Sequence, residues 1–300
     1  MSELPGTPSR LQTGIYDLGY RPYEGQRFGR AYALGSLFTY SLRAIFGLGR
    51  SWVAKGFAIG LAIIALVPAL VQLAIAAIAP EEFEFTRFEN YFSFVSIVIV
   101  LFCAVSAPEV IGRDQRHHTL ALYFSRALSR GDYVTAKLAA LLAGLLIVLL
   151  TPQVLLLTGN AVATEEIVDY LADNLGEIPP IVASSLVVAA MMGSLSLAVA
   201  SQTPRRAWAT GAVIIYFVVA TALGAVLRET ISSSDGDYAI LISPIHVLEG
   251  SVFWIFDAAP EPDSDLADIT FRGYYYLAAA AAYTLLGVAV VYRRFLKLAV

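Results

Sequence analysis

Six runs of about twenty apolar and almost uncharged residues constrain this chain more than any other feature. A helix needs about 20 apolar residues to cross a hydrocarbon core of about 30 Å. Backbone groups in lipid must bond within the chain, and the runs lack the alternation of barrel strands, so they are expected to be helices. The predicted spans cover residues 56–79, 91–111, 138–163, 181–201, 207–227 and 274–292.

The distribution of charge between the spans predicts how the chain lies in the membrane. Hydrophobic residues make up 58% of the chain and charged residues only 15%, against roughly 25% charged in soluble domains. With six spans, 17 of the 20 lysines and arginines fall on one side, and 18 of the 24 acidic residues on the other. Basic loops stay in the cytoplasm. We therefore expect a multi-pass protein of the cell (cytoplasmic) membrane with both termini in the cytoplasm.

Residues 238–256 are apolar enough to suggest a seventh span, although they contain Pro244, His246 and Glu249. A seventh crossing would carry the basic residues of the C-terminal tail outside, against the charge rule. We interpret the stretch as an interfacial or re-entrant helical segment within an extracellular segment, 228–273. The predicted fold is an all-α polytopic membrane protein with six transmembrane helices.

The region before the first span mixes apolar residues at spacings of three and four with arginines. This pattern predicts an amphipathic helix over 31–55 that lies in the headgroup layer. A simple extension of the first span is the alternative. Residues 1–30 are predicted to form a cytoplasmic arm that is either packed under the membrane or unstructured.

The connector between the second and third spans, 112–137, reads "GRDQRHHTLALYFSRALSRGDYVTAK". Five basic residues and two histidines alternate there with apolar and aromatic ones, which favours a short helix that docks into a protein groove. Charge beside a membrane is also commonly just a topology signal, and this interpretation stays open. The candidate docking residues are Asp114, Thr119, Leu120, Leu122, Tyr123, Phe124, Arg126 and Arg130.

This connector resembles the corresponding loop in permeases of ABC export systems of the type-2 class. The matching positions, in order, are Asp114, Thr119-Leu120, Ser125-Arg126, Leu128-Ser129-Arg130, Tyr133 and Lys137. His118 stands where glycine is common in the family, and Ala127 where proline is common. The layout of an amphipathic helix, six spans and a long outer segment before the last span is similar too.

The resemblance implies that the connector is a coupling helix and that the chain works with other subunits. The implied partners are two ABC ATPase subunits, which would bind ATP and Mg, and a second permease copy, identical or paralogous. The chain itself contains no G-x-x-x-x-G-K-[ST] phosphate-binding loop. We therefore expect no cofactor and no ATPase activity in this chain, and no nucleic-acid partner.

A search for other chemistry leaves few candidates. The sequence has no H-E-x-x-H, Cys-x-x-Cys or G-x-S-x-G motif, so no catalytic, metal-binding or cofactor-binding residue is predicted. Glu109 lies within the second span, where we expect Pro108 to bend the helix and Arg113 to pair with the carboxylate. His246 and Glu249, three residues apart, are gating candidates that share a helix face.

These features together predict the membrane-spanning permease of an ATP-driven exporter that works by alternating access. The absence of buried charge across most of the spans favours a hydrophobic or amphipathic substrate, and residues 228–273 are the expected outer gate. Two other classes stay open. One is an ATP-independent membrane carrier or assembly scaffold, and the other is a membrane-embedded enzyme.

Overall fold

The computed structural model is built of helices, in agreement with the predicted fold class. It describes residue 25 and residues 28–49, 52–78, 88–117, 119–125, 128–163, 167–231, 234–260, 262 and 264–297. Every regular element among these residues is helical. Most of the predicted arm, 1–30, lies outside the described residues.

Six helices among the described residues are long and apolar enough to cross a membrane. Each overlaps one of the predicted spans, so the six-span prediction is confirmed. They are α2 (Trp52–Ile78), α3 (Asn90–Ala107), α6 (Arg130–Ala163), α8 (Ile178–Ala200), α9 (Arg206–Thr230) and α11 (Tyr274–Leu296). α8 is preceded by α7 (Ile167–Asp173) and a 3-10 turn, η2 (Asn174–Glu177), and these extend the fourth span to Ile167–Ala200.

α6 begins earlier than the sequence indicated. Residues 130–137, assigned to the connector from sequence, form its first two turns. Ser129 and Asp132 explain the early start. The Ser129 hydroxyl accepts a hydrogen bond from the Asp132 backbone N–H at 3.2 Å, and the Asp132 carboxylate accepts one from the Ser129 N–H at 2.9 Å. This reciprocal capping box satisfies backbone donors that a helix start otherwise leaves unpaired.

α3 continues past its last α-helical residue into the connector. A π-helical turn, η1 (Pro108–Gly112), follows it and leads into α4 (Arg113–Arg116) and α5 (Leu120–Phe124). Proline lacks the N–H that continues the α-helical ladder, and a π-helical turn is a common way to accommodate such a break. The irregularity expected at Pro108 therefore occurs at that residue.

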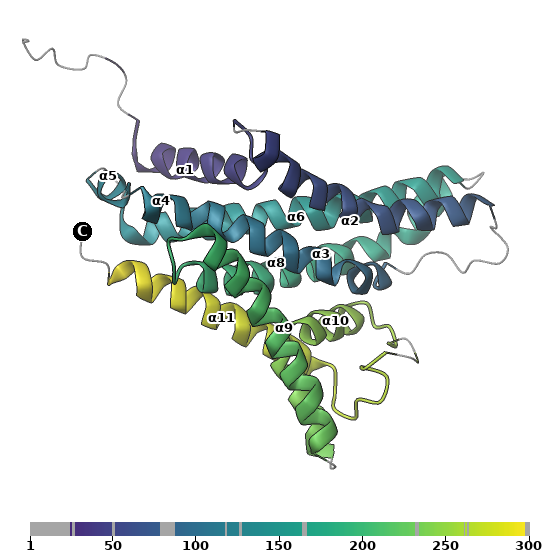
Figure 1. Ribbon diagram of the computed structural model, residues 1–300. Helices are drawn as coiled ribbons and strands as arrows, with labels where there is room; N and C mark the ends of the chain where they lie inside the picture. Colours follow the sequence, from purple (N-terminus) through teal and green to yellow (C-terminus); the bar gives the residue numbers. More distant parts are fainter. Residues whose placement is uncertain are drawn as a thin grey trace, which may run out of the picture.

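α3 and α8 lie at the centre of the bundle, whereas α2 and α9 lie at its periphery (Figure 1). In the apolar part of α3 and of α8, 72% of the residues are buried, against 17% in α2 and α9. α8 and α11 approach closely at Gly287, where an added Cβ would lie 2.6 Å from the backbone carbon of Ser194. Small residues allow membrane helices to pack at such short distances.

The amphipathic helix expected over 31–55 is α1 (Arg30–Ile45). It ends at a turn in which Gly47 and Gly49 have φ values of 65° and 84°, a conformation that favours glycine. Its apolar side packs on α6: a Cβ added to Gly144 would lie 3.1 Å from Ile45 Cδ1. The predicted amphipathic helix is therefore present, and its apolar side packs on protein.

The length of α6 explains why protein covers the apolar side of α1. A helix of 34 residues is about 51 Å long at 1.5 Å per residue, while the hydrocarbon core is about 30 Å thick. The part of α6 that extends beyond the hydrocarbon core offers an apolar surface on which α1 can pack. The opposite side of α1 stays exposed and carries hydroxyl groups and Arg43.

The bent helix pair before α11 is re-entrant and does not cross. It consists of η3 (Ser234–Ile242) and α10 (Pro244–Ile255), which meet at 103°. The bend lies deep in the bundle, because Ser243 bonds to Thr221 at 3.0 Å and Tyr283 donates to the Ile242 carbonyl at 2.8 Å.

Both ends of this pair return to one level. Near the end of α9, Arg228 lies 3.7 Å from Asp237, and near the start of α11, a Cβ on Gly273 would overlap Trp254. The bend contacts Thr221, seven residues before Arg228 in α9, and Tyr283, ten residues after Gly273, which corresponds to a depth of about 10–15 Å. The predicted re-entrant segment is thus confirmed. The last residues of α9 and the first residues of α11 lie at the same end of the bundle.

The two ends of the bundle can now be named. The basic end contains α1, the connector, the turn 201–205 and the C-terminal part of α11, which gather on one side (Figure 1). An Arg30–Asp132 ion pair of 2.7 Å and a 2.7 Å bond from Arg130 to the Leu296 carbonyl hold it together. The opposite end contains residues 88–89, α7, the end of α9 and the described residues of 256–273.

Candidate functional site

The connector from η1 to the start of α6 is the main candidate site. It lies at the basic end, between the two chain-terminal helices α1 and α11 (Figure 1). The structure brings one set of the predicted residues into the protein interior and leaves another at the surface. These two sets have different chemistry and are described in turn.

Asp114 is buried and does not face outward as a docking residue would. Its carboxylate oxygen Oδ2 lies 2.7 Å from Lys137 Nζ and accepts a hydrogen bond from the Tyr133 hydroxyl at 2.9 Å. All three residues are less than 9% exposed. The prediction that Asp114 contacts a partner directly is therefore wrong, and its contacts instead attach α4 to the first turns of α6.

Lys137 and Tyr133 were named from the sequence only as positions of the family resemblance. The Lys137 ammonium also lies 5.3 Å from the centre of the Tyr133 ring and 6.0 Å from that of Tyr40 in α1. Glu109 is thus not the only ionisable residue buried near a span. The Asp114–Lys137 pair was not predicted, because the predicted spans end at 111 and begin at 138 and both residues fall outside them. A requirement that charges beside apolar runs find partners would have indicated it.

The exposed part of the connector is α5 and its flanks. Leu122 projects from it with 66% of its surface exposed, while Leu120, Tyr123 and Phe124 are partly buried against the core. The Tyr123 and Phe124 rings lie 5.8 Å and 5.9 Å from the Tyr133 ring. The connector therefore exposes the apolar side chain of Leu122, while the neighbouring rings of Tyr123 and Phe124 pack against Tyr133 of α6.

Three other predicted docking residues have distinct positions. The Thr119 backbone N–H donates to the Asp114 carbonyl at 3.1 Å, which closes the turn between α4 and α5. Arg130 donates to the Leu296 carbonyl and lies 5.8 Å from the Phe124 ring centre, so it joins the connector to α11. Arg126 lies outside the described residues.

Glu109 pairs with a residue that sequence spacing did not indicate. Its carboxylate lies 2.9 Å from the guanidinium of Arg206, the first residue of α9. Arg113, the predicted partner, instead lies over the ring of Tyr40 in α1 at 6.0 Å. The i, i+4 prediction is wrong because tertiary packing brings the start of α9 beside η1, a contact that local spacing does not reveal.

His246 and Glu249 lie at the opposite end and share a pocket of about 310 Å³. His246 Nε2 is 3.3 Å from a carboxylate oxygen of Asp265, whereas Glu249 lies one turn further along α10. The predicted shared face is confirmed. The pocket is lined by Asn90, Ser93, Phe94, His246, Glu249, Phe253, Ser264 and Asp265.

The connector thus combines the buried Asp114–Lys137 pair with the exposed side chain of Leu122. Within the described ranges, no three His, Cys, Asp or Glu side chains gather closely enough to hold a metal ion. Comparison with protein-family models gives no match to this chain, and comparison with characterised proteins gives none either.

Proposed function

We propose that the chain is the membrane-spanning permease subunit of an ATP-driven ABC exporter. In this proposal two separate ATPase subunits bind ATP and Mg²⁺ and dock on the connector at the basic end. A second permease copy completes the pathway. The basic end then lies in the cytoplasm of the cell membrane, as the charge asymmetry predicts.

The observation that carries this proposal is the combination of an exposed tip and a buried anchor in one connector. Leu122 is exposed at the end of the bundle. The Asp114–Lys137 contact of 2.7 Å, a few residues away, couples the same segment to α6. A push on the tip is therefore transmitted to α3 and α6 together, since interiors are packed tightly enough to transmit strain.

Alternating access requires that ATP binding favour one arrangement of the spans over the other. The connector supplies a lever for this, and the re-entrant pair at the opposite end supplies a segment that moves with α9 and α11. We propose that a hydrophobic or amphipathic substrate passes between the two permease copies, and that residues 228–273 close the outer side.

A substitution at the tip tests the proposal. We expect Leu122→Asp to abolish the permease-stimulated part of ATP hydrolysis in the reconstituted complex, because a carboxylate cannot replace an apolar contact in a groove. Leu296→Asp is the matched control: Leu296 is also exposed, at 52%, and lies at the same end but outside the connector. Full stimulation in Leu122→Asp, with normal assembly, would exclude the docking role.

An ATP-independent carrier is the second candidate, and the pocket at the opposite end is the observation that favours it. His246, Glu249 and Asp265 line one pocket and can exchange protons there, as proton-coupled carriers require. Transport by the chain without an ATPase, driven by a pH gradient and lost in Glu249→Gln, would support this candidate. Co-purification of an ATPase subunit from mild detergent would support the exporter.

A further inference from the structure

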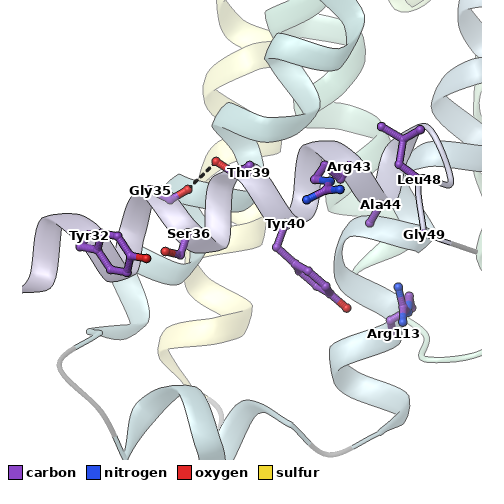
Figure 2. Close-up of a pocket in the computed structure, with 10 residues that line it drawn as sticks. All are labelled: Tyr32, Gly35, Ser36, Thr39, Tyr40, Arg43, Ala44, Leu48, Gly49 and Arg113. Carbon is purple, nitrogen blue, oxygen red and sulfur yellow. Dashed lines mark hydrogen bonds between the residues drawn. The ribbon is translucent and has the colours of Figure 1, made fainter. Parts of the chain in front are cut away.

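The exposed side of α1 forms a pocket that the proposed transport function does not use. It encloses about 730 Å³, within the range of sites for small molecules. Figure 2 shows its wall of side chains from α1, with Tyr40 reaching toward the segment that carries Arg113. The lining residues are Tyr32, Gly35, Ser36, Thr39, Tyr40, Arg43, Ala44, Leu48, Gly49 and Arg113.

The charge of this pocket is positive. Arg43 and Arg113 line it from two different helices, and no carboxylate of the described residues lines it. Neither guanidinium forms an ion pair with a described carboxylate. The neighbouring Asp114 does not neutralise them, because it is paired with Lys137 at 2.7 Å. The net attraction is for an anion.

The polar groups around the two arginines suit a phosphate. Guanidinium groups bind phosphate oxygens through parallel N–H donors, and the hydroxyl groups of Ser36 and Tyr40 add single donors. The Thr39 hydroxyl donates to the Gly35 carbonyl at 2.9 Å, which leaves its oxygen as an acceptor for a headgroup hydroxyl. Arg113 lies over the Tyr40 ring at 6.0 Å, a contact that orients the guanidinium.

The surroundings favour a lipid as the source of the phosphate. Leu48 and Gly49 form one side of the pocket, and α2, which starts at Trp52, exposes apolar side chains that include Phe57, Ile63 and Ile64. The pocket therefore lies where the headgroup layer meets the hydrocarbon. Basic pockets of this kind at a membrane face recognise anionic headgroups.

We propose that this pocket binds the phosphate of an anionic phospholipid, held between Arg43 of α1 and Arg113 of α4. The site links the amphipathic helix to the helix that carries Asp114, so a bound headgroup bridges α1 and the connector. The assignment does not depend on ATP coupling, and its test needs the full-length chain alone.

Binding of phosphatidylglycerol to the purified, delipidated chain is measured by native mass spectrometry, with phosphatidylcholine as the neutral headgroup. We expect Arg43→Gln and Arg113→Gln each to weaken phosphatidylglycerol binding about ten-fold, as for loss of one charge-assisted contact. Binding of phosphatidylcholine is expected to stay unchanged. Arg116→Gln is the matched control, because Arg116 is exposed at the same end but does not line the pocket.

A second variant tests the pocket without changing its charge. Gly35 lines the pocket and nothing lies within 4 Å of a Cβ added there, so the ring of Gly35→Phe can occupy part of the pocket while both arginines are kept. We expect it to weaken phosphatidylglycerol binding as much as Arg43→Gln does. An equal loss in Arg116→Gln, or unchanged binding in Arg43→Gln and Arg113→Gln, would overturn the site.

Inorganic phosphate distinguishes the two sources of the ligand. We expect phosphatidylglycerol to stay bound when inorganic phosphate is added at the same concentration, because the lipid also contacts the apolar wall at Leu48. Displacement of the lipid by an equal concentration of phosphate would overturn the lipid assignment and identify a site for the free anion.

Discussion

The basic end and the opposite end of the bundle differ in how short their ion pairs are and in how much they rely on aromatic packing. At the basic end, ionisable side chains from helices far apart in the chain pair with one another. Asp114 meets Lys137, Glu109 meets Arg206 and Arg30 meets Asp132, all at 2.9 Å or less. These pairs connect α1, η1, α4, α6 and α9, and no disulfide is available to a chain with one cysteine.

The opposite end has longer ion pairs, Arg228–Asp237 at 3.7 Å and His246–Asp265 at 3.3 Å, and adds aromatic stacking and close packing at small residues. The rings of Tyr238 and Phe271 stack at 5.1 Å, and Phe271 lies 5.0 Å from Tyr276. Gly250 packs directly against this cluster and has no room for a side chain, because an added Cβ would lie 2.6 Å from the Tyr276 ring. The re-entrant pair is therefore fixed against α11 by close packing.

The difference teaches which end tolerates which change. A buried ion pair is sensitive to the loss of either partner, because the remaining charge is left without compensation. Aromatic packing is sensitive to added volume. In the proposed exporter, the basic end receives the force from the ATPase subunits, and the opposite end carries the outer gate. The two kinds of contact can be tested separately.

The largest effect is expected from Lys137→Met. The substitution keeps the volume of the side chain but leaves the Asp114 carboxylate buried without its cation, which costs about 3–5 kcal/mol of unfolding free energy. Reversible unfolding in mixed micelles measures this loss.

The double variant Asp114→Asn with Lys137→Met is the control for that prediction. It removes both charges and keeps the Tyr133 hydrogen bond, so we expect it to be more stable than Lys137→Met alone. If the single and double variants were equally unstable, the ion pair would not be the cause.

An intermediate effect is expected from Gly250→Ala at the opposite end. The new methyl group overlaps the Tyr276 ring, and overpacking of this kind costs about 1–3 kcal/mol. The same unfolding measurement applies. Gly176→Ala, also at the opposite end, is the control, since nothing lies within 4 Å of a Cβ there. A loss in Gly176→Ala as large as that in Gly250→Ala would argue against the packing explanation.

The sequence predicted the architecture because apolar length and charge asymmetry act along the chain. They located the six spans and the re-entrant pair. If that pair crossed the membrane, the basic C-terminal tail would lie outside, against the charge rule. They did not locate contacts between distant segments. Glu109 was assigned to Arg113 by local spacing, whereas Arg206 is its partner, and Asp114 was placed at a docking surface although it is buried.

One of these missed contacts could have been predicted from the sequence. Ser129 and Asp132 form the S-x-x-[DE] capping signature of a helix start, which would have moved the third span back to Arg130 and brought Lys137 into a helix. The side of α1 that packs on protein was not readable in this way. Its apolar pattern suits lipid and protein equally well, and only the excess length of α6 decides between them.

The smallest effect is expected from Arg30→Gln, which breaks the exposed member of the ion pairs at the basic end. Arg30 is 64% exposed and Asp132 12% exposed, so water and salt screen the pair, and its loss is expected to lower the unfolding free energy far less than Lys137→Met does. Asp132→Ala is expected to lower the unfolding free energy more than Arg30→Gln does, because it also removes the acceptor for the Ser129 N–H in the capping box. Unfolding in low and high salt separates the two contributions, since only the ion-pair part shrinks as salt rises. A cost for Arg30→Gln close to that for Lys137→Met would mean that burial does not set the strength of these pairs, and the contrast between the two ends of the bundle would then need another cause.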